Sequence, residues 1–205
     1  ALPGLAMAGL HAYDGHNAHP DLETRKKLSR ESIQAVHALR ESLQKAGVPC
    51  DLLVVGGTPS FPVHAEYDGV FLSPGTVFIT DARKSVGRDD FVFEPGAAVL
   101  TRVISHPAEG TFTLDLGSKA IACDIPGDRG FIIGHEEMKP LFQSEEHWVF
   151  SAPKGTAVPA IGELLLVVPT HVCPTSALYP YALVAEGGSI ADRWDVTARD
   201  RFPAL

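Results

Sequence analysis

His171 and Cys173 lie two positions apart, just after an apolar stretch that ends at Pro169. An imidazole nitrogen and a thiolate together favour zinc among the divalent ions. Side chains two apart in an extended chain point to the same side, so an extended conformation would let both hold one ion. Two protein ligands leave coordination positions open for water and substrate, which suits a catalytic ion better than a structural one. The spacing also arises by chance, so it is weak evidence when taken alone.

A second group of candidate residues surrounds the end of an apolar run at residues 5–13, which predicts a buried strand. Tyr13, His16 and His19 place a phenol and two imidazoles just beyond that run. Ligand sites in α/β folds form where parallel strands end, and histidine can act there as an acid or a base. A solvated loop that is merely rich in histidine is the alternative.

A third group directly follows the apolar run at residues 51–55: Gly56, Gly57 and Thr58, with Pro59 and Ser60 after them. Glycines allow a close approach of the backbone, and free N–H groups with the two hydroxyls of Thr58 and Ser60 provide what a phosphate group needs. The segment therefore predicts a phosphate-binding loop, with an ordinary turn as the alternative.

The elements that position these residues change in character along the chain. Apolar spacing predicts one long amphipathic helix at residues 20–46, between the strands at 5–13 and 51–55, which is a unit of a parallel sheet. A further apolar segment at 76–80 is a third strand candidate and closes this region. Short runs rich in β-formers then predict antiparallel strands at residues 97–105, 111–116, 120–123, 147–150 and 163–168. We therefore expect an α/β domain at 1–85 and an all-β domain at 86–205, with a polar crossing at 82–92.

The α/β domain has too few strands for a complete parallel sheet, because such sheets need several strands and cover on both faces. A (β/α)₈ barrel takes about 250 residues. We therefore expect residues 1–85 to be the C-terminal portion of such a TIM-type barrel, with the N-terminal barrel segment supplied from elsewhere.

Composition narrows the function classes. The 205 residues are 45% hydrophobic with a net charge of −8, which offers no electrostatic footprint for nucleic acid or an anionic membrane. Apolar runs fall short of the roughly 20 residues that a membrane helix needs. Three widely spaced cysteines encode no disulfide framework, so we expect a cytoplasmic protein.

Taken together and in order, six segments resemble the metal-activated, pyridoxal-phosphate-dependent D-threonine aldolase and D-serine dehydratase family, which has the alanine-racemase-like fold. The resemblance covers nearly the whole chain. The segments are residues 9–19, 56–64, 73–76 with Asp81, 115–120, 144–147 and 169–175.

The resemblance implies a barrel that binds pyridoxal phosphate, followed by a β domain with a divalent metal: zinc first, with manganese or magnesium as alternatives. It implies that Tyr13 and His19 are catalytic, that Gly56, Gly57 and Thr58 hold the cofactor phosphate, and that His171 and Cys173 are the metal ligands. No lysine here corresponds to the family's Schiff-base lysine, which lies on the first barrel strand. A homodimer and a small D-amino acid substrate are also implied.

The activity that the resemblance implies is aldol cleavage of a β-hydroxy D-amino acid to glycine and an aldehyde. Elimination of the D-serine dehydratase type, which yields a 2-oxo acid and ammonia, is the first alternative. A non-catalytic fragment or binding subunit is the second, because the chain as it stands cannot form the cofactor linkage.

Overall fold

The computed structural model describes residues 3–82, 90 and 93–200, which form two compact units. The first unit holds residues 3–78 together with Asp90 and Phe93, and the second holds residues 79–82 and 94–200. The chain therefore crosses between the units more than once, whereas the sequence suggests one crossing at 82–92.

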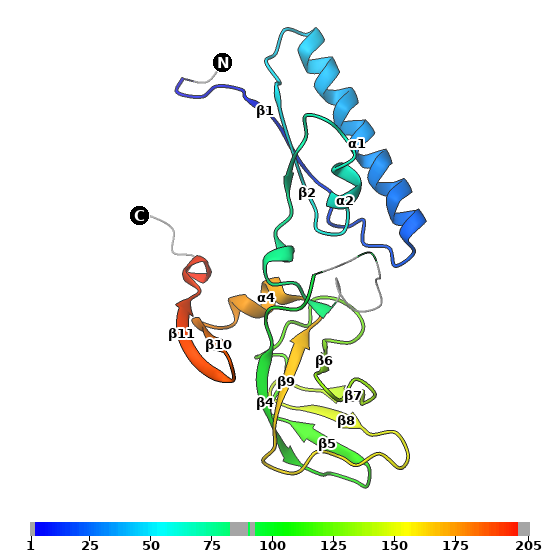
Figure 1. The fold of residues 1–205 in the computed structure, drawn as a ribbon, viewed down its shortest axis with the longest axis vertical. Coiled ribbons are helices and arrows are strands. Elements are labelled where there is room, and N and C mark those ends of the chain that lie inside the picture. The colour runs from blue at the N-terminus through cyan, green and yellow to red at the C-terminus, as the bar shows by residue number, and fades with distance from the viewer. Residues whose placement is uncertain (1–2, 83–89, 91–92, 201–205) are drawn as a thin grey trace. The chain divides into compact units, whose positions relative to one another are not determined.

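The first unit is built on a three-stranded parallel sheet in the order β1 (Gly9–Tyr13), β2 (Leu52–Gly56) and β3 (Phe71–Ser73). Helix α1 (Leu22–Lys45) connects the first two strands, and the short helix α2 (Phe61–His64) connects the second and third. Helix α1 lies along one side of the sheet (Figure 1). Ile33 on this helix is fully buried against Leu53 and Val55 of β2, which forms the core of the unit.

Helix α1 begins and ends where its sequence predicts. The carboxylate of Asp21 accepts a hydrogen bond from the N–H of Thr24 at 2.8 Å, which caps the first turn. At the other end the helix stops before Gly47, whose φ of +78° favours glycine. The predicted helix at residues 20–46 is therefore confirmed to within two residues.

The second unit contains a six-stranded antiparallel sheet in the order β6-β9-β4-β5-β8-β7. The strands are β4 (Val99–Ser105), β5 (Thr111–Leu114), β6 (Gly130–Ile132), β7 (Lys139–Gln143), β8 (Trp148–Ser151) and β9 (Leu164–Pro169). Phe112, Trp148 and Phe150 form the aromatic centre of its core, with Phe112 stacked on Phe150. The predicted antiparallel β character is confirmed.

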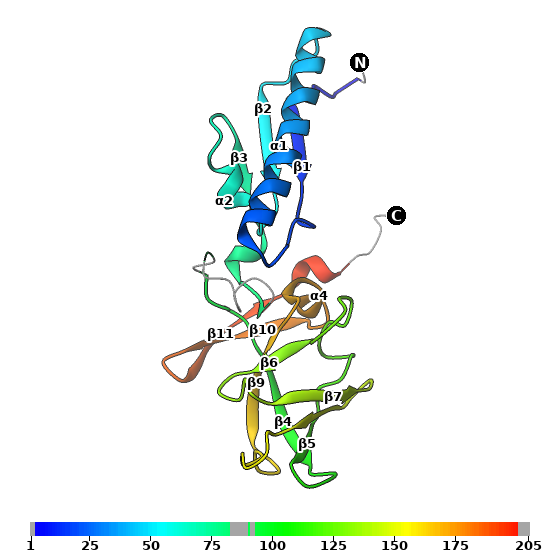
Figure 2. The same cartoon turned by 90° about the vertical axis from the view of Figure 1, so that its right-hand side faces the viewer.

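A helix, a β-hairpin and the 3₁₀ turn η2 (Thr197–Arg199) follow β9 in the second unit. Helix α4 (Val172–Ala177) comes first, and the hairpin of β10 (Tyr181–Glu186) and β11 (Ser189–Asp195) comes after it (Figure 2). Gly187 and Gly188 form the hairpin turn with positive φ angles of +55° and +81°, as a two-residue turn matched to the strand twist requires.

Two strand predictions are wrong. Residues 76–80 form no strand: the 3₁₀ turn η1 covers Thr76–Phe78, and the third strand is β3, which is too short to show a period in the sequence. Residues 120–123 lie in and after a turn in which the carbonyl of Gly117 accepts from the N–H groups of Ala120 and Ile121. Their apolar side chains reflect burial, which a packed turn produces as well as a strand does.

Within the described residues, none of the helices has the length and apolar character needed to cross a membrane.

Candidate active site

The parallel register brings two of the predicted site segments to the same edge of the sheet. Tyr13, the last residue of β1, pairs with Gly56, and Gly56 pairs with Ser73 of β3. Because the strands are parallel, the loops that leave them at residues 14–19, 57–60 and 74–76 start side by side. This is the edge at which parallel folds build ligand sites.

The ring of Tyr13 also lies beside Gly56, where the side chain of a larger residue would be. A Cβ atom at Gly56 would lie 3.2 Å from Cδ2 of the Tyr13 ring, and one at Gly15 would lie 2.0 Å from the phenolic oxygen. The ring of Tyr13 therefore occupies the space that these glycines leave open, and it remains 74% exposed. The structure thus places the predicted catalytic tyrosine beside the predicted phosphate loop.

His19 is exposed at the start of α1. Its Nδ1 atom accepts a hydrogen bond from the N–H of Asp21 at 3.1 Å, and its carbonyl accepts one from the Arg25 guanidinium at 2.8 Å. Arg25 is buried and also pairs with Asp90. The hydrogen bonds of His19 to described residues therefore hold it to the start of the helix and not to residues 56–58.

The loop at residues 56–60 is buried throughout. The hydroxyl oxygen of Thr58 accepts from the N–H of Thr76 at 3.1 Å, so its own proton remains available to a ligand. The N–H groups of Gly57 and Thr58 make no hydrogen bond to another described residue. Two backbone donors and a hydroxyl fit a phosphate group, so the predicted role is compatible with the geometry.

A pocket of about 230 Å³ lies next to these loops. Its lining is polar at Tyr13, Asp14, His16, Ser32 and His64, and apolar side chains of β1, α1 and β2 supply the remainder. The pocket therefore combines titratable groups with an apolar wall, as small-molecule sites do.

The predicted metal ligands lie at the start of helix α4 and not in an extended segment, which corrects the geometric reasoning applied to the sequence. His171 is the N-cap residue, and Cys173 belongs to the first turn. The argument that alternate side chains of an extended chain point the same way does not apply here. A shared ion therefore remains a prediction.

The surroundings of His171 nevertheless suit a metal ligand. Its Nδ1 atom lies 2.7 Å from the Oδ2 atom of Asp124. Metal-binding histidines usually donate their second ring N–H to such a carboxylate, which leaves the other nitrogen for the ion. His171 is partly exposed and Cys173 is exposed, so an ion could reach both. Among the described residues, no group of three or more His, Cys, Asp or Glu side chains is arranged as a metal site.

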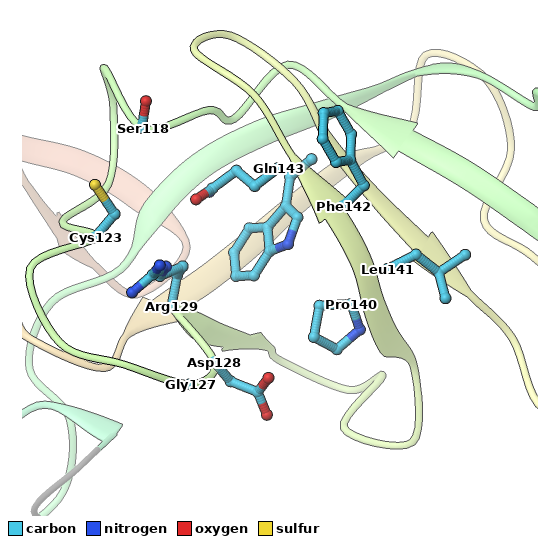
Figure 3. Close-up of a pocket in the computed structure, with 10 residues that line it drawn as sticks. Ser118, Cys123, Gly127, Asp128, Arg129, Pro140, Leu141, Phe142 and Gln143 are labelled. Carbon is cyan, nitrogen blue, oxygen red and sulfur yellow. The ribbon is translucent and has the colours of Figure 1, made fainter.

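A larger pocket, of about 380 Å³, lies elsewhere in the second unit. Figure 3 shows Cys123, Arg129 and Gln143 on one side of it and Pro140 and Leu141 on the other. The guanidinium of Arg129 donates to the carbonyl of Ile125 in its own loop. The pocket contains none of the predicted site residues, and we assign it no function.

Sequence reasoning missed three residues of these sites: Asp14, His64 and Asp124. The first two lie inside the segments at residues 9–19 and 56–64, so their position was visible but their contact was not. The hydroxyl of Ser60, which the sequence suggests as a phosphate donor, instead donates to Asp14. Asp124 is 47 positions from His171, and no local pattern connects them.

Comparison with known proteins finds relatives over most of the chain. Residues 96–185 match the family model described as "Putative serine dehydratase domain". The chain is 32% identical to a D-threonine aldolase of Arthrobacter sp over 97% of its length and 53% of that protein. It is 27% identical to a D-threo-3-hydroxyaspartate dehydratase of Delftia sp. over 91% of its length and 55% of that protein.

A comparison with solved structures finds relatives of the same kind. A crystal structure of D-threonine aldolase from Filomicrobium marinum matches 96% of this chain and 54% of that one, with a TM-score of 0.84 and 28% identity. The fold is therefore that of the alanine-racemase-like enzymes. Within this class, the chain is similar to D-threonine aldolase over nearly its whole length, and residues 96–185 match the serine dehydratase domain, which is the resemblance that its motifs predict. It spans about half the length of the two relatives compared above.

Proposed function

We propose that the chain is part of a lyase that depends on pyridoxal phosphate and a divalent metal and cleaves β-hydroxy D-amino acids to glycine and an aldehyde. The observation that carries the proposal is the pairing of Tyr13 with Gly56, which puts a phenol beside a loop whose Gly57 and Thr58 N–H groups make no hydrogen bond to another described residue. The likeness to D-threonine aldolase over 97% of the chain supports the same reaction.

Residues 56–58 are the proposed holders of the cofactor phosphate. The N–H groups of Gly57 and Thr58 and the Thr58 hydroxyl would donate to its oxygens. When bound, pyridoxal phosphate supplies an electron sink for charge at the substrate Cα. This loop would hold the phosphate and thereby orient the bound cofactor beside Tyr13.

Tyr13 and His19 are the proposed proton-handling groups. Because Nδ1 of His19 accepts from the N–H of Asp21, the neutral ring carries its proton on Nε2. In this arrangement His19 donates from Nε2, and it gains a lone pair for proton abstraction only when the Asp21 bond is released. The exposed phenol of Tyr13 faces no such constraint.

His171 and Cys173 are the proposed metal ligands, with zinc as the expected ion because they combine nitrogen and sulfur. The bound ion supplies Lewis acidity toward a substrate hydroxyl. Asp124 would keep the Nδ1 proton in place, so that Nε2 faces the ion.

The α/β unit is the proposed closing part of a (β/α)₈ barrel. The face of the sheet that α1 does not cover carries exposed Leu52, Phe71 and Tyr13. Parallel sheets are normally buried on both faces, which supports further barrel strands from a segment outside residues 1–205. We also propose a homodimer, which light scattering on the protein as encoded by its gene would test.

Elimination to a 2-oxo acid and ammonia is the second candidate reaction. The thiol of Cys173, in place of an oxygen ligand, resembles the zinc-dependent dehydratase members of the family, and the Delftia relative is named a dehydratase. Identification of the products from D-threonine and D-serine separates the two reactions. Glycine with an aldehyde supports aldol cleavage, and a 2-oxo acid with ammonia supports elimination.

Cys173→Ala tests the metal site. We expect this variant to lose bound zinc and turnover, while the affinity for pyridoxal phosphate stays unchanged. Cys123→Ala, which removes another exposed thiol, is the matched control and should retain its metal. Full metal content in Cys173→Ala would show that the ligand assignment is wrong.

His19→Ala tests the division of roles. Aldol cleavage needs a proton to leave the β-hydroxyl, whereas elimination needs it to leave Cα, so His19→Ala should reduce glycine formation more than 2-oxo acid formation. Equal loss of both products would show that His19 is not the base that takes the proton of the β-hydroxyl in aldol cleavage.

A further inference from the structure

Asp14 is the centre of a buried hydrogen-bond network that joins the two loops of the α/β unit. Asp14 is 4% exposed as a residue, and Ser60 and His64 are fully buried. The Oδ2 atom accepts from Nε2 of His64 at 2.9 Å and from the amide of Asn17 at 3.1 Å, and the Oδ1 atom accepts from the Ser60 hydroxyl. The donors come from two different loops. Asn17 lies in the loop after β1, and Ser60 and His64 lie in the segment after β2 that contains the phosphate loop.

The carboxylate is ionised in this network. Burial by itself raises the pKa of Asp14, but the hydrogen bonds from His64 and Ser60 and the charge of His64 outweigh it, and the pKa lies below the ordinary value. Because a carboxylate can only accept hydrogen bonds, Nε2 of His64 must carry a proton and donate it. The interaction is therefore charge-assisted and directional.

Gly57 shows how closely this carboxylate lies to the proposed phosphate loop. A Cβ atom at Gly57 would lie 2.4 Å from Oδ1 of Asp14 and 2.6 Å from Oγ of Ser60. Gly57 also has a φ of +124°, which residues with side chains rarely adopt. The loop is thus in direct contact with the Asp14 carboxylate, and the second glycine leaves the space for it.

The His64 ring has no other polar partner among the described residues. Its Nδ1 atom is buried and makes no hydrogen bond. Burial of an unmatched polar nitrogen costs free energy, so apolar packing alone would favour an aliphatic side chain at this position. What the imidazole adds here is its bond to Asp14.

We infer that Asp14 and His64 are a positioning pair that holds the Gly57–Thr58 backbone donors in register with Tyr13. Asp14 directly follows Tyr13 in the chain, and its own N–H donates to the carbonyl of Gly56 at 3.3 Å. The network therefore ties the residue after the phenol to both sides of the phosphate loop. This inference rests on the proposed phosphate-binding role of residues 56–58.

An explanation based on charge alone and one based on positioning predict opposite effects of Asp14→Asn on the affinity for phosphate. A carboxylate close to a bound phosphate repels it, so Asp14→Asn would tighten phosphate binding if charge were its only influence. If Asp14 instead positions the donors, the same substitution weakens binding, because asparagine cannot accept from all three donors in the same geometry.

The test compares pyridoxal phosphate with pyridoxal, which lacks the phosphate group, by calorimetric titration of the protein as encoded by its gene. In Asp14→Asn and His64→Gln we expect about tenfold weaker binding of pyridoxal phosphate, or roughly 1.4 kcal/mol, and little change for pyridoxal. General loosening of the fold would weaken both ligands alike. Asp68→Asn, which alters an exposed carboxylate of the same unit, is the matched control.

Three results would overturn the inference: equal weakening for both ligands, no change, or tighter binding of pyridoxal phosphate.

Thr58→Ala shows whether the loop binds phosphate at all. If Thr58→Ala leaves the ratio of the two affinities unchanged, the proposed phosphate site is wrong. If Thr58→Ala changes the ratio and Asp14→Asn does not, only the positioning pair is wrong. If Asp14→Asn fails to fold, Ser60→Ala removes a single donor and should shift the ratio in the same direction.

Discussion

The Oδ2 atom of Asp124 lies 2.7 Å from Nδ1 of His171, although 47 positions separate the two residues in the sequence. His171 stands at the N-terminus of α4, and Asp124 follows the turn at residues 117–121. The two segments are also joined by a hydrogen bond from the N–H of Ala122 to the Thr175 hydroxyl, at 3.1 Å. The carboxylate is therefore held in place to orient the imidazole.

Asp124→Ala should weaken metal binding without abolishing it. Loss of a carboxylate that orients a metal-binding histidine typically costs about 10- to 100-fold in affinity. Competition with a chromogenic chelator measures this, and Asp128→Ala, in the same loop, is the control. Unchanged zinc affinity in Asp124→Ala would contradict the orienting role.

Gly57→Ala should destabilise the α/β unit more than a glycine substitution elsewhere. The new methyl group would meet Asp14 and Ser60 and would need a φ of +124°, so we expect a loss of roughly 3 kcal/mol. Gly69→Ala is the control, because Gly69 has a φ of +71° with no atom near its Cβ position, and it should lose about 1–2 kcal/mol. Chemical denaturation measures both, and equal losses would show that the contact with Asp14 carries no cost.

The stability contributed by Asp14 should depend on pH. Its pKa in the folded protein lies below the ordinary value of 3.8, so its contribution is present above that value and is lost as the pH falls through the folded-state pKa. His64, Ser60 and Asn17 are the polar groups that face the carboxylate. The difference in unfolding free energy between wild type and Asp14→Asn should therefore be larger at about pH 5.5 than at about pH 3. A difference that grows on acidification would mean that the carboxylate is not stabilised in its ionised form.

Arg25→Met should be more destabilising than Arg30→Met. Arg25 is 1% exposed, donates to the His19 carbonyl and pairs with Asp90, so its removal leaves a partly buried carbonyl and carboxylate unpaired at a cost of about 1–3 kcal/mol. Arg30 forms an exposed pair with Glu66, for which a change of at most about 1 kcal/mol is expected. Thermal unfolding of the two variants compares them, and similar shifts would contradict the structural role of Arg25.

The sequence by itself determined the elements with strong local signals and the resemblance to D-threonine aldolase. Helix α1 was predictable because apolar residues recur on one face and an aspartate cap and a glycine stop delimit it. Strands β2, β4 and β9 were predictable because each is a bounded run of buried, branched or aliphatic residues. Tyr13, Gly56 and His171 were identified as candidates because their types and places after strands are local properties.

Only the tertiary structure decided which of these residues meet. The pairing of Tyr13 with Gly56 depends on parallel register, and the contacts of Asp14 with His64 and of Asp124 with His171 span 50 and 47 positions. Such contacts carry no local periodicity, because hydrogen bonds between distant loops depend on how the chain closes on itself. The same reason explains the errors at residues 76–80 and 120–123: burial of an apolar run depends on its neighbours in space, and a turn can satisfy it as well as a strand.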